Sequence, residues 1–368
     1  MRNRLHALCP YFAMFPESFV AEQVSSHTKP GDIIFDPFSG RGTTVLQSLL
    51  MGRRAIALDI NPVAYCISRA KADVPPLCDV LDEIAALESA YKNADAEALE
   101  AIRCGLPRFY RRAFYHSTLR ELLFLRASLK WRVNPVHCFI SALALGCLHG
   151  EKGKPFQYFS NQMPRTISTK PDYSVRYWEA HNLWPERRKV FSTLRRRAAY
   201  RLCGDVPKLR GEVKMGDARD GAKHFPHLQT SAAMVLTSPP YLDVTSYEED
   251  QWLRMWFLGY PERPSYRKIS KDDRHTSGPA YWRFLSDVWS GISPLLRDRA
   301  VIVCRLGAKG VKKGDLTRNI MNSMRRAFPG ARLTKEPLLS RIRGRQTECF
   351  RPGSEGCLYE VDYTFVVS

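Results

Sequence analysis

The chain has 368 residues and a mass of 42.1 kDa, a length that predicts about two structural units, or one large α/β domain with an insertion. Hydrophobic residues make up 44% of it and charged residues 25%, which excludes a disordered, collagen-like or coiled-coil protein. The 56 Lys and Arg residues against 37 Asp and Glu residues give a formal net charge of +19, which favours a polyanionic partner such as nucleic acid or an acidic membrane surface.

The cysteines and the apolar segments give no sign of a metal-binding, redox, secreted or membrane protein. The 10 cysteines include no C-x-x-C pair, so they indicate neither a zinc knuckle nor a thioredoxin-like site, and we expect reduced thiols. Pro10 and Pro16 interrupt the N-terminal segment, and no apolar core of signal-peptide length follows. The longest apolar run, residues 139–148, is shorter than the roughly 20 residues of a membrane helix. We therefore expect a cytoplasmic protein without a membrane role.

Residues 31–64 have the pattern of a βαβ unit. The expected elements are a strand over residues 32–35, a tight turn over 40–44, a helix over 45–51 and a second strand over 54–58. Asp59 ends the second strand, 23 residues after Asp36, the separation at which a carboxylate meets a ribose in such units. The unit predicts a cofactor of nucleoside type, although its glycines alone also fit a purely structural turn.

The residues around the turn narrow the choice of cofactor. A P-loop needs a Lys after its second Gly, but Thr43 follows Gly42 here. A dinucleotide-binding turn needs a third Gly where this chain has Val45. Asp36 precedes the turn and would repel a pyrophosphate, but it suits the ammonium group of an amino acid. The pattern therefore favours S-adenosylmethionine over ATP and NAD.

The charge is distributed unevenly along the middle of the chain. Residues 79–100 have a helical apolar spacing and seven acids against one Lys, which predicts one acidic amphipathic helix. Residues 101–210 contain 22 Lys and Arg against 6 Asp and Glu. Aromatic residues are interleaved with the basic ones at 107–116, 174–184 and 187–202. This mixture suits a surface that follows phosphates and stacks on bases, and a helical subdomain with basic solvated faces is the alternative.

Within this basic segment, residues 119–129 and 139–148 predict helices, the second of them buried. Residues 158–166 predict a loop whose polar side chains could reach base edges. A second basic stretch over residues 340–351 could share the contact with nucleic acid. The expected nucleic-acid-binding residues are Arg41, Arg111, Arg112, Asn161, Gln162, Arg165, Arg343 and Arg345.

A second motif follows the basic segment. Residues 212–220 predict a strand followed by Asp217, and residues 232–236 predict a strand that ends in Thr-Ser-Pro-Pro-Tyr. The two prolines end this strand and fix a rigid turn at its carboxyl end, where open α/β sheets place their active sites. Beyond the motif, residues 246–260 predict a helix with core aromatic side chains, and residues 358–367 predict the last strand.

At this point the chain resembles the amino-group DNA methyltransferases, which modify the N4 amine of cytosine or the N6 amine of adenine. Two motifs carry the resemblance. DPFSGRGTT at residues 36–44 is similar to the family's acid-Pro-Phe-x-Gly-x-Gly cofactor loop, and TSPPY at residues 237–241 is similar to its [Ser/Asn/Asp]-Pro-Pro-[Tyr/Phe] catalytic loop. The resemblance covers residues 8–76 and 211–260 and hardly touches the segment between them.

The resemblance implies an α/β fold, a Rossmann-like methyltransferase sheet with an inserted basic, mainly helical subdomain. Residues 1–76 and 211–368 would form the catalytic domain, and residues 77–210 would form the insert. The insert does not match the usual placements of target recognition regions in the family. Its role in DNA recognition is therefore a hypothesis from charge and position.

The resemblance also implies a site for S-adenosyl-L-methionine. The acid and glycines of residues 36–42 would hold the methionine part, Asp59 the ribose hydroxyls and Asp217 the adenine amino group. Residues 10–19 resemble the segment that closes over the methionine moiety. The expected cofactor-binding residues are Phe15, Asp36, Pro37, Phe38, Gly40, Gly42, Thr43, Thr44, Asp59, Ile60, Asn61, Asp217 and Ala218.

The catalytic loop implies a direct transfer. Ser238 and the Pro239 carbonyl would hydrogen-bond the target amine and localise its lone pair for in-line attack on the sulfonium methyl group. Tyr241 would stack on a base flipped out of the duplex. No metal and no covalent intermediate are required. The expected catalytic residues are Ser238, Pro239, Pro240 and Tyr241.

The target base is left open between two candidates. Ser before Pro-Pro is the commoner form in N4-cytosine enzymes, whereas Asp or Asn is commoner in N6-adenine enzymes, so Ser238 favours cytosine. Methylation of cytosine carbon 5 is excluded because the chain has no Pro-Cys dipeptide. We expect a site-specific enzyme of double-stranded DNA in a bacterial or phage restriction-modification system, with a cognate endonuclease as a further partner. The rivals are an RNA methyltransferase acting on guanine N2 or adenine N6, and a catalytically silent nucleic-acid-binding protein.

Overall fold

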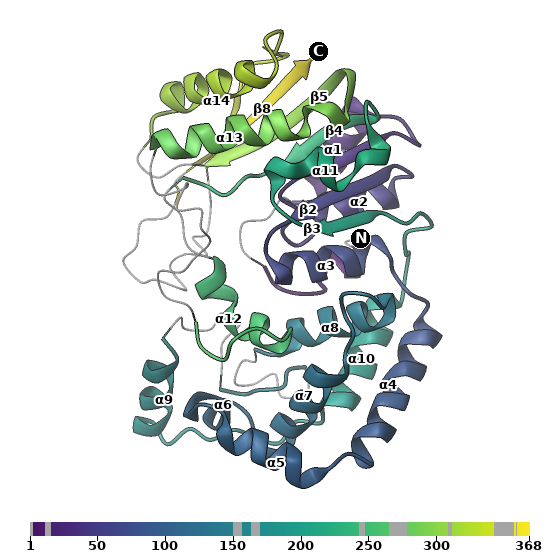
Figure 1. The fold of residues 1–368 in the computed structure, drawn as a ribbon, viewed down its shortest axis with the longest axis vertical. Coiled ribbons are helices and arrows are strands. Elements are labelled where there is room, and N and C mark those ends of the chain that lie inside the picture. The colour runs from purple at the N-terminus through teal and green to yellow at the C-terminus, as the bar shows by residue number, and fades with distance from the viewer. Residues whose placement is uncertain are drawn as a thin grey trace. The chain divides into compact units, whose positions relative to one another are not determined.

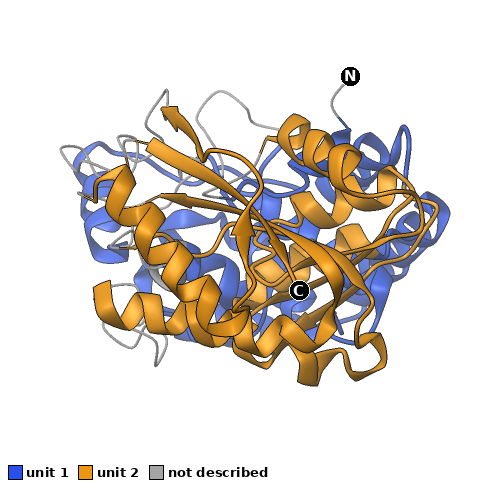
Figure 2. Cartoon of the chain, turned by 90° about the horizontal axis from the view of Figure 1, so that it is seen from above, with its two compact units in different colours: residues 1–12, 73–206, 246–268 blue, residues 13–72, 207–245, 269–368 orange. Residues whose placement is uncertain are grey.

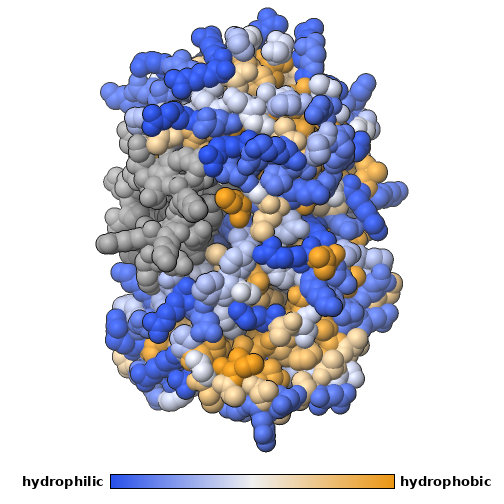
Figure 3. Space-filling view, viewed as in Figure 1, coloured by the Kyte–Doolittle hydropathy of each residue, from blue (hydrophilic) through white to orange (hydrophobic). Residues whose placement is uncertain are grey.

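The computed structural model describes residues 3–11, 16–149, 157–162, 170–242, 247–264, 278–307, 311–341, 357 and 359–368. The chain divides into two compact units, coloured separately in Figure 2. Unit 1 comprises residues 1–12, 73–206 and 246–268. Unit 2 comprises residues 13–72, 207–245 and 269–368. Hydrophilic side chains cover much of the face drawn in Figure 3, and smaller hydrophobic patches interrupt them.

Unit 2 is built on an eight-stranded sheet with the order β3-β2-β1-β4-β5-β8-β6, and β7 pairs with β8. The strands are β1 (Ile33–Asp36), β2 (Arg54–Asp59), β3 (Glu212–Met215), β4 (Ala232–Thr237), β5 (Leu296–Gly307), β6 (Arg332–Leu333), β7 (Leu338–Arg341) and β8 (Tyr359–Val367). Strands β1 to β5 run parallel to one another, and β8 is antiparallel to β5. The order reverses between β1 and β4, where doubly wound sheets bind their ligands. The predicted Rossmann-like α/β fold is confirmed.

Helices cover both faces of this sheet, so its central strands are apolar on both sides. The helices of unit 2 are α1 (Glu17–His27), α2 (Thr43–Leu50), α3 (Pro62–Ala72), α11 (Gly221–His224), α13 (Gly278–Ile292) and α14 (Lys313–Ala327), with short 3-10 helices η2 (Ala218–Asp220), η3 (Pro226–Leu228) and η5 (Ser293–Leu295). Phe35 of β1 joins the core under α13 and α14, which run side by side in Figure 1. Ile34 points to the opposite face and packs with Val20 and Val24 of α1.

The regular elements of unit 1, in the part of it that the structure describes, are all helices. Its elements are η1 (Arg4–Ala7), α4 (Leu77–Lys92), α5 (Ala96–Gly105), α6 (Arg108–Ala113), α7 (His116–Ser128), α8 (Pro135–Cys147), α9 (Pro171–Ala180), α10 (Val190–Leu202) and α12 (Tyr247–Phe257). The predicted helices over 119–129 and 139–148 correspond to α7 and α8, and residues 138–147 of α8 are all buried. The described part of the predicted loop, residues 158–162, contains no helix or strand.

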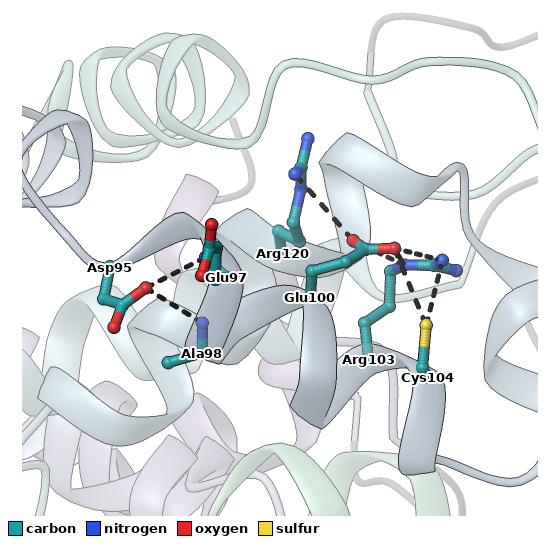
Figure 4. Close-up of polar contacts among 7 residues, drawn as sticks. All are labelled: Asp95, Glu97, Ala98, Glu100, Arg103, Cys104 and Arg120. Carbon is teal, nitrogen blue, oxygen red and sulfur yellow. Dashed lines mark hydrogen bonds and ion pairs between the residues drawn. The ribbon is translucent and has the colours of Figure 1, made fainter.

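The prediction of one helix over residues 79–100 is wrong, because α4 ends at Lys92 and α5 begins at Ala96. Asp95 causes the break, since its carboxylate accepts hydrogen bonds from the backbone N–H groups of Glu97 and Ala98, both at 2.9 Å, and so caps α5. Figure 4 shows this cap and the polar cluster that follows it. In that cluster Glu100 contacts Arg103 within α5 and Arg120 of α7, which ties the two helices together.

Helix α12 belongs to unit 1 by its packing. Its Trp252 contacts Phe109 with ring centroids 4.9 Å apart, and its Trp256 contacts Tyr110 at 4.5 Å. Both tryptophans are buried, as the sequence predicts. The predicted domain division assigns α12 to the catalytic domain, whereas these long-range aromatic contacts assign it to the helical unit.

Candidate functional site

The acid that ends β1 is buried. Asp36 is 2% exposed, and its Oδ1 accepts hydrogen bonds from Thr237 Oγ1 at 2.8 Å and from the Phe38 N–H group at 3.1 Å. Burial raises the pKa of Asp36 from 3.8 to about 6, although these bonds oppose the shift. The Asp36–Thr237 bond therefore joins the predicted cofactor loop to the predicted catalytic loop, because Thr237 is the last residue of β4.

The turn after β1 requires glycine at one position in particular. Gly42 has a φ of +71°, in the left-handed region, and a Cβ atom there would lie 2.9 Å from the Cα atom of Ser68 on α3. Ser68 Oγ donates to the Gly40 carbonyl at 3.1 Å, and the buried Lys71 donates to the Arg41 carbonyl at 2.6 Å. The turn is thus fixed from beneath by α3, and this close approach explains the glycine.

Asp59 at the end of β2 reaches back to the same turn. Its Oδ2 accepts from the Gly40 N–H group at 2.8 Å, and its Oδ1 accepts from the Asn61 N–H group at 2.9 Å. Loss of hydration raises the pKa of Asp59 to about 7, and the nearby Asp36 adds to the shift. Two carboxyl groups with raised pKa values therefore flank one glycine turn, a pattern enriched at functional sites.

The other expected cofactor-binding residues differ in burial and in their contacts. Pro37, Thr43, Thr44, Asn61 and Ala218 are buried, Phe38 is half-buried, and Phe15 lies outside the described residues. Ile60 is 46% exposed, although it is a large apolar residue. Asp217 forms a bidentate ion pair with Arg219, at 3.0 and 2.6 Å. The roles assigned to these residues stay predictions.

The loop after β4 is held by hydrogen bonds from its own side chains and from its neighbours. Ser238 Oγ donates to the Arg305 carbonyl of β5 at 3.2 Å and lies 3.4 Å from the Tyr241 hydroxyl. The Tyr241 hydroxyl donates to Glu360 Oε1 of β8 at 2.7 Å. Tyr281 of α13 donates to the Pro240 carbonyl at 2.9 Å. The Pro-Pro turn is therefore held by contacts from β5, β8 and α13. Pro239 is buried.

Sequence reasoning missed the ionic cluster that supports this loop. Arg305 is 8% exposed and pairs with Asp362 through Nε at 2.6 Å and Nη2 at 2.8 Å, and its Nη1 lies 3.6 Å from Glu360 Oε2. Burial and the negative charge of Glu360 raise the pKa of Tyr241, so its hydroxyl keeps its proton. The sequence of the last strand contains a signal for this cluster. Glu360 and Asp362 stand at alternate positions of an otherwise apolar segment, so both must lie on the same face of the strand.

The ring of Tyr241 lies against a glycine of β5. A Cβ atom at Gly307 would approach Tyr241 Cε2 to 2.7 Å, so the strand needs glycine at this position. In the antiparallel register of β5 and β8, Gly307 pairs with Glu360 and Arg305 pairs with Asp362. Gly307, which lies against the Tyr241 ring, and Glu360, which accepts from the Tyr241 hydroxyl, are therefore neighbours across the two strands.

The expected nucleic-acid-binding residues have different environments. Arg111 is exposed on α6, whereas Arg112 is buried, donates to the Leu183 carbonyl at 3.0 Å and lies 3.8 Å from the ring centre of Trp184. Arg41 is also buried, and its Nε donates to Thr43 Oγ1 at 3.1 Å. Arg165, Arg343 and Arg345 lie outside the described residues.

The two polar residues of the loop make structural contacts. Asn161 Oδ1 accepts from the Glu186 N–H group at 2.9 Å, and its Nδ2 donates to the Trp184 carbonyl at 3.2 Å. Gln162 is buried, its Nε2 donates to the Arg112 carbonyl at 3.4 Å, and its backbone carbonyl accepts from the Trp178 indole at 3.1 Å. These contacts fix the loop within unit 1, and contact with base edges stays a prediction.

No group of three His, Cys, Asp or Glu side chains in the part of the chain that the structure describes has an arrangement that could hold a metal ion. No described helix combines the length and the apolar character needed to cross a membrane.

Residues 2–69 match the DNA methylase family, and this segment holds the turn with Asp36 and Asp59. The type II methyltransferase M.MjaII of Methanocaldococcus jannaschii is 39% identical over 69 residues, which are 19% of this chain and 13% of that protein. The orphan methyltransferase M.BamHII of Bacillus amyloliquefaciens is 41% identical over 54 residues, 15% of this chain and 20% of that protein. These matches span a fifth or less of the two relatives.

Among solved structures, TrmN from Thermus thermophilus is 9% identical with a TM-score of 0.38, over 100% of this chain and 52% of that one. The rRNA methyltransferase aviRa from Streptomyces viridochromogenes is 11% identical with a TM-score of 0.35, over 99% of this chain and 90% of that one. The family uses S-adenosyl-L-methionine as its cofactor, and the buried acid beside a glycine turn fits its ammonium group. Over residues 2–69, the chain is therefore similar to the DNA methylases of the N6-adenine and N4-cytosine type.

Proposed function

We propose that the protein methylates the exocyclic N4 amine of cytosine at specific sites in DNA. The observation that carries this proposal is the hydrogen bond between Thr237 and Asp36, at 2.8 Å, because it brings the ends of β4 and β1 together. A loop that binds the methyl donor and a loop that binds the amine must adjoin for direct transfer. When bound, S-adenosyl-L-methionine supplies an electrophilic methyl group on a sulfonium centre.

The residues of unit 2 support specific steps in this proposal. The carboxylate of Asp36 would pair with the ammonium group of the cofactor, and Asp59 would accept from its ribose hydroxyls. Ser238 Oγ has lone pairs to accept from an amine, because its proton is donated to the Arg305 carbonyl. The Pro239 carbonyl would accept the second amine hydrogen. Both acceptors would localise the nitrogen lone pair, which conjugation with the ring otherwise withdraws.

Tyr241 would hold the base during transfer. Its ring is backed by Gly307 and its hydroxyl is held by Glu360, so the side chain is preorganised on one side. An amine inside a duplex cannot be reached, so the base would be flipped, and stacking on Tyr241 would offset part of the unstacking cost. The basic helical unit would hold the phosphate backbone of double-stranded DNA, since this region carries most of the positive charge.

The test is to incubate the protein with DNA and methyl-labelled S-adenosylmethionine, digest the product and identify the modified nucleoside by mass spectrometry. N4-methylcytosine is the expected product. N6-methyladenine would overturn the assignment of the base but keep the site. Label in structured RNA run alongside, with none in DNA, would favour the RNA rival, and no label in either would favour a silent binding protein.

A role in restriction-modification is part of the proposal. The resemblance and the name of the type II relative support it. The expected result is that DNA modified by the protein resists cleavage by a cognate endonuclease acting at the same site. Methylation without a fixed sequence context would contradict this role.

A further inference from the structure

Helix α9 of unit 1 presents a row of exposed aromatic rings. Tyr173 is 55% exposed and Tyr177 is 46% exposed, and their near-parallel rings lie 6.5 Å apart at an angle of 26°. The ring of His181 continues the row 4.1 Å from Tyr177, and its Nδ1 contacts the Tyr177 carbonyl at 2.8 Å. The spacing of four residues places all three rings on one face of the helix.

The opposite face of α9 is the one that packs into unit 1. Val175 and Trp178 are buried there, and Trp178 contacts Phe109 with ring centroids 5.5 Å apart. The Trp178 indole donates to the Gln162 carbonyl at 3.1 Å. The helix therefore has a satisfied apolar face, and the tyrosines on its other face are not needed for the core.

A fourth ring is held in the solvent just beyond the helix. Trp184 is 62% exposed, yet its indole N–H donates to Asn182 Oδ1 at 2.8 Å. Asn182 has a φ of +50°, a left-handed conformation that a residue other than glycine rarely adopts. The guanidinium group of the buried Arg112 covers one face of the ring at 3.8 Å. Exposed aromatic residues fixed in this way are typical of binding surfaces.

The charge around the four rings is positive. Residues 107–113 and 170–189 contain eight Lys and Arg against three acids. Glu179 is neutralised by Arg108, at 2.5 Å, and Glu186 by Arg188, at 2.6 Å. Arg111 and Arg176 are exposed on α6 and α9. Aromatic rings among cationic side chains are the arrangement with which proteins bind nucleic-acid strands whose bases are accessible.

We propose that the rings of Tyr173, Tyr177, His181 and Trp184 form a stacking surface for unpaired DNA bases, which we call the α9 platform. It deepens the proposed function, because it assigns one part of the helical unit to the strand that is unpaired near a flipped base. Binding by the platform requires neither cofactor nor methyl transfer. Its failure can therefore be distinguished from a failure of the proposed activity.

The experiment measures binding of the full chain to a fluorescent single-stranded DNA oligonucleotide and to the same oligonucleotide with abasic sites. The wild-type protein is expected to bind the base-containing strand at least about fivefold more tightly, since stacking depends on the bases and the phosphate charge is equal. Tyr177→Ala and Trp184→Ala are expected to bring this ratio close to one. Their affinity for the abasic strand should stay at the wild-type level.

Two controls separate stacking from other effects. Tyr200→Ala removes another exposed aromatic ring of unit 1, 51% exposed on α10, and should keep the wild-type ratio. Arg176→Gln should weaken binding of both strands equally. It should also lower the slope of log affinity against log salt concentration by about one, the effect of one lost phosphate contact. Trp184→Ala removes the ring that the buried Arg112 covers and could unfold the protein. Tyr177 takes no part in that contact, so Tyr177→Ala still tests the proposal. A wild-type ratio of one, or a ratio that Tyr177→Ala leaves unchanged, would overturn the proposal.

Discussion

The hydroxyl group of Tyr241 donates a hydrogen bond to Glu360 Oε1 at 2.7 Å, which joins the loop after β4 to the last strand of the sheet. Glu360 also lies 3.6 Å from Arg305, whose guanidinium group is anchored by Asp362. A buried hydrogen-bonded group of this kind fixes the position of a side chain more strongly than it adds to stability. The loop after β4 is therefore positioned in part by Glu360, which lies 119 positions from Tyr241 in sequence.

Removal of this contact should affect catalysis more than binding. In Tyr241→Phe and Glu360→Gln we expect kcat to fall by about tenfold, the effect of one hydrogen bond to a charged group, with little change in KM for DNA. Tyr241→Ala should also raise KM, because the stacking ring is lost. Steady-state methylation kinetics measure both values. Glu336→Gln makes the same charge change at an 88% exposed side chain and should behave as wild type, and an equal loss there would argue against a positioning role for Glu360.

Cofactor binding should depend on pH through the two acids of the glycine turn. In the free protein the pKa of Asp36 is about 6 and that of Asp59 about 7. The cofactor is expected to bind the ionised carboxylates, so its affinity should rise with pH from about 5 and level off above about 8, one unit above the pKa of Asp59. Calorimetric titrations over this range measure the effect. Asp36→Asn should weaken binding and flatten the pH dependence, and a wild-type affinity independent of pH would contradict the ammonium contact.

The same two groups should make the free protein less stable as pH rises. Their folded pKa values lie above the ordinary value of 3.8, so the folded state binds more protons than the unfolded state between that value and about 7. Their contribution to the free energy of unfolding is therefore full below the unfolded pKa and is lost as pH rises through the folded pKa. Urea unfolding of the wild type and of Asp36→Asn measures it. A difference between the two that does not change with pH would contradict the raised pKa of Asp36.

The glycine turn should not tolerate a side chain at position 42. Gly42→Ala combines a left-handed φ with a contact of 2.9 Å to the Ser68 backbone, so we expect a loss of about 2–3 kcal/mol in unfolding free energy and impaired cofactor binding. Gly31→Ala is the matched control, because it has a φ of +87° but no heavy atom within 4 Å of the added Cβ. It should cost about 1 kcal/mol and leave cofactor binding intact. Equal effects of the two substitutions would mean that the Ser68 contact is unimportant.

The ion pair between Arg305 and Asp362, next to the loop after β4, should matter for stability. Asp362→Asn removes the bidentate carboxylate partner of the buried Arg305 guanidinium group and leaves only Glu360, at 3.6 Å, so we expect a cost approaching that of a broken buried ion pair, about 3–5 kcal/mol. Asp220→Asn breaks an exposed pair with Lys223 and should change stability by less than about 1 kcal/mol. Chemical unfolding of both variants measures the difference. Similar values for the two would show that Arg305 is hydrated in solution.

The local parts of the fold were predictable from the sequence, and the long-range parts were not. The β1–α2–β2 unit and the turn after β4 have boundaries close to the predicted ones, because each depends on a short apolar run and on adjacent Gly or Pro residues. The break at Asp95 was missed because its capping bonds outweigh a continuous apolar period. The burial of Arg112 and the support of Tyr241 by Glu360 depend on residues distant in the chain, which no local pattern specifies.

The measurement that tests the central claim most directly is the single-turnover rate of methyl transfer to DNA in Ser238→Ala, with cofactor affinity measured on the same preparation. Ser238 would contact the amine as it gains charge, so its loss should lower the rate by about 100-fold and leave the affinity for S-adenosylmethionine within about twofold of wild type. Thr237→Val is the matched comparison, because it removes the hydroxyl that contacts Asp36 and should weaken cofactor binding instead. An unchanged transfer rate in Ser238→Ala would show that the loop after β4 does not hold the reacting amine.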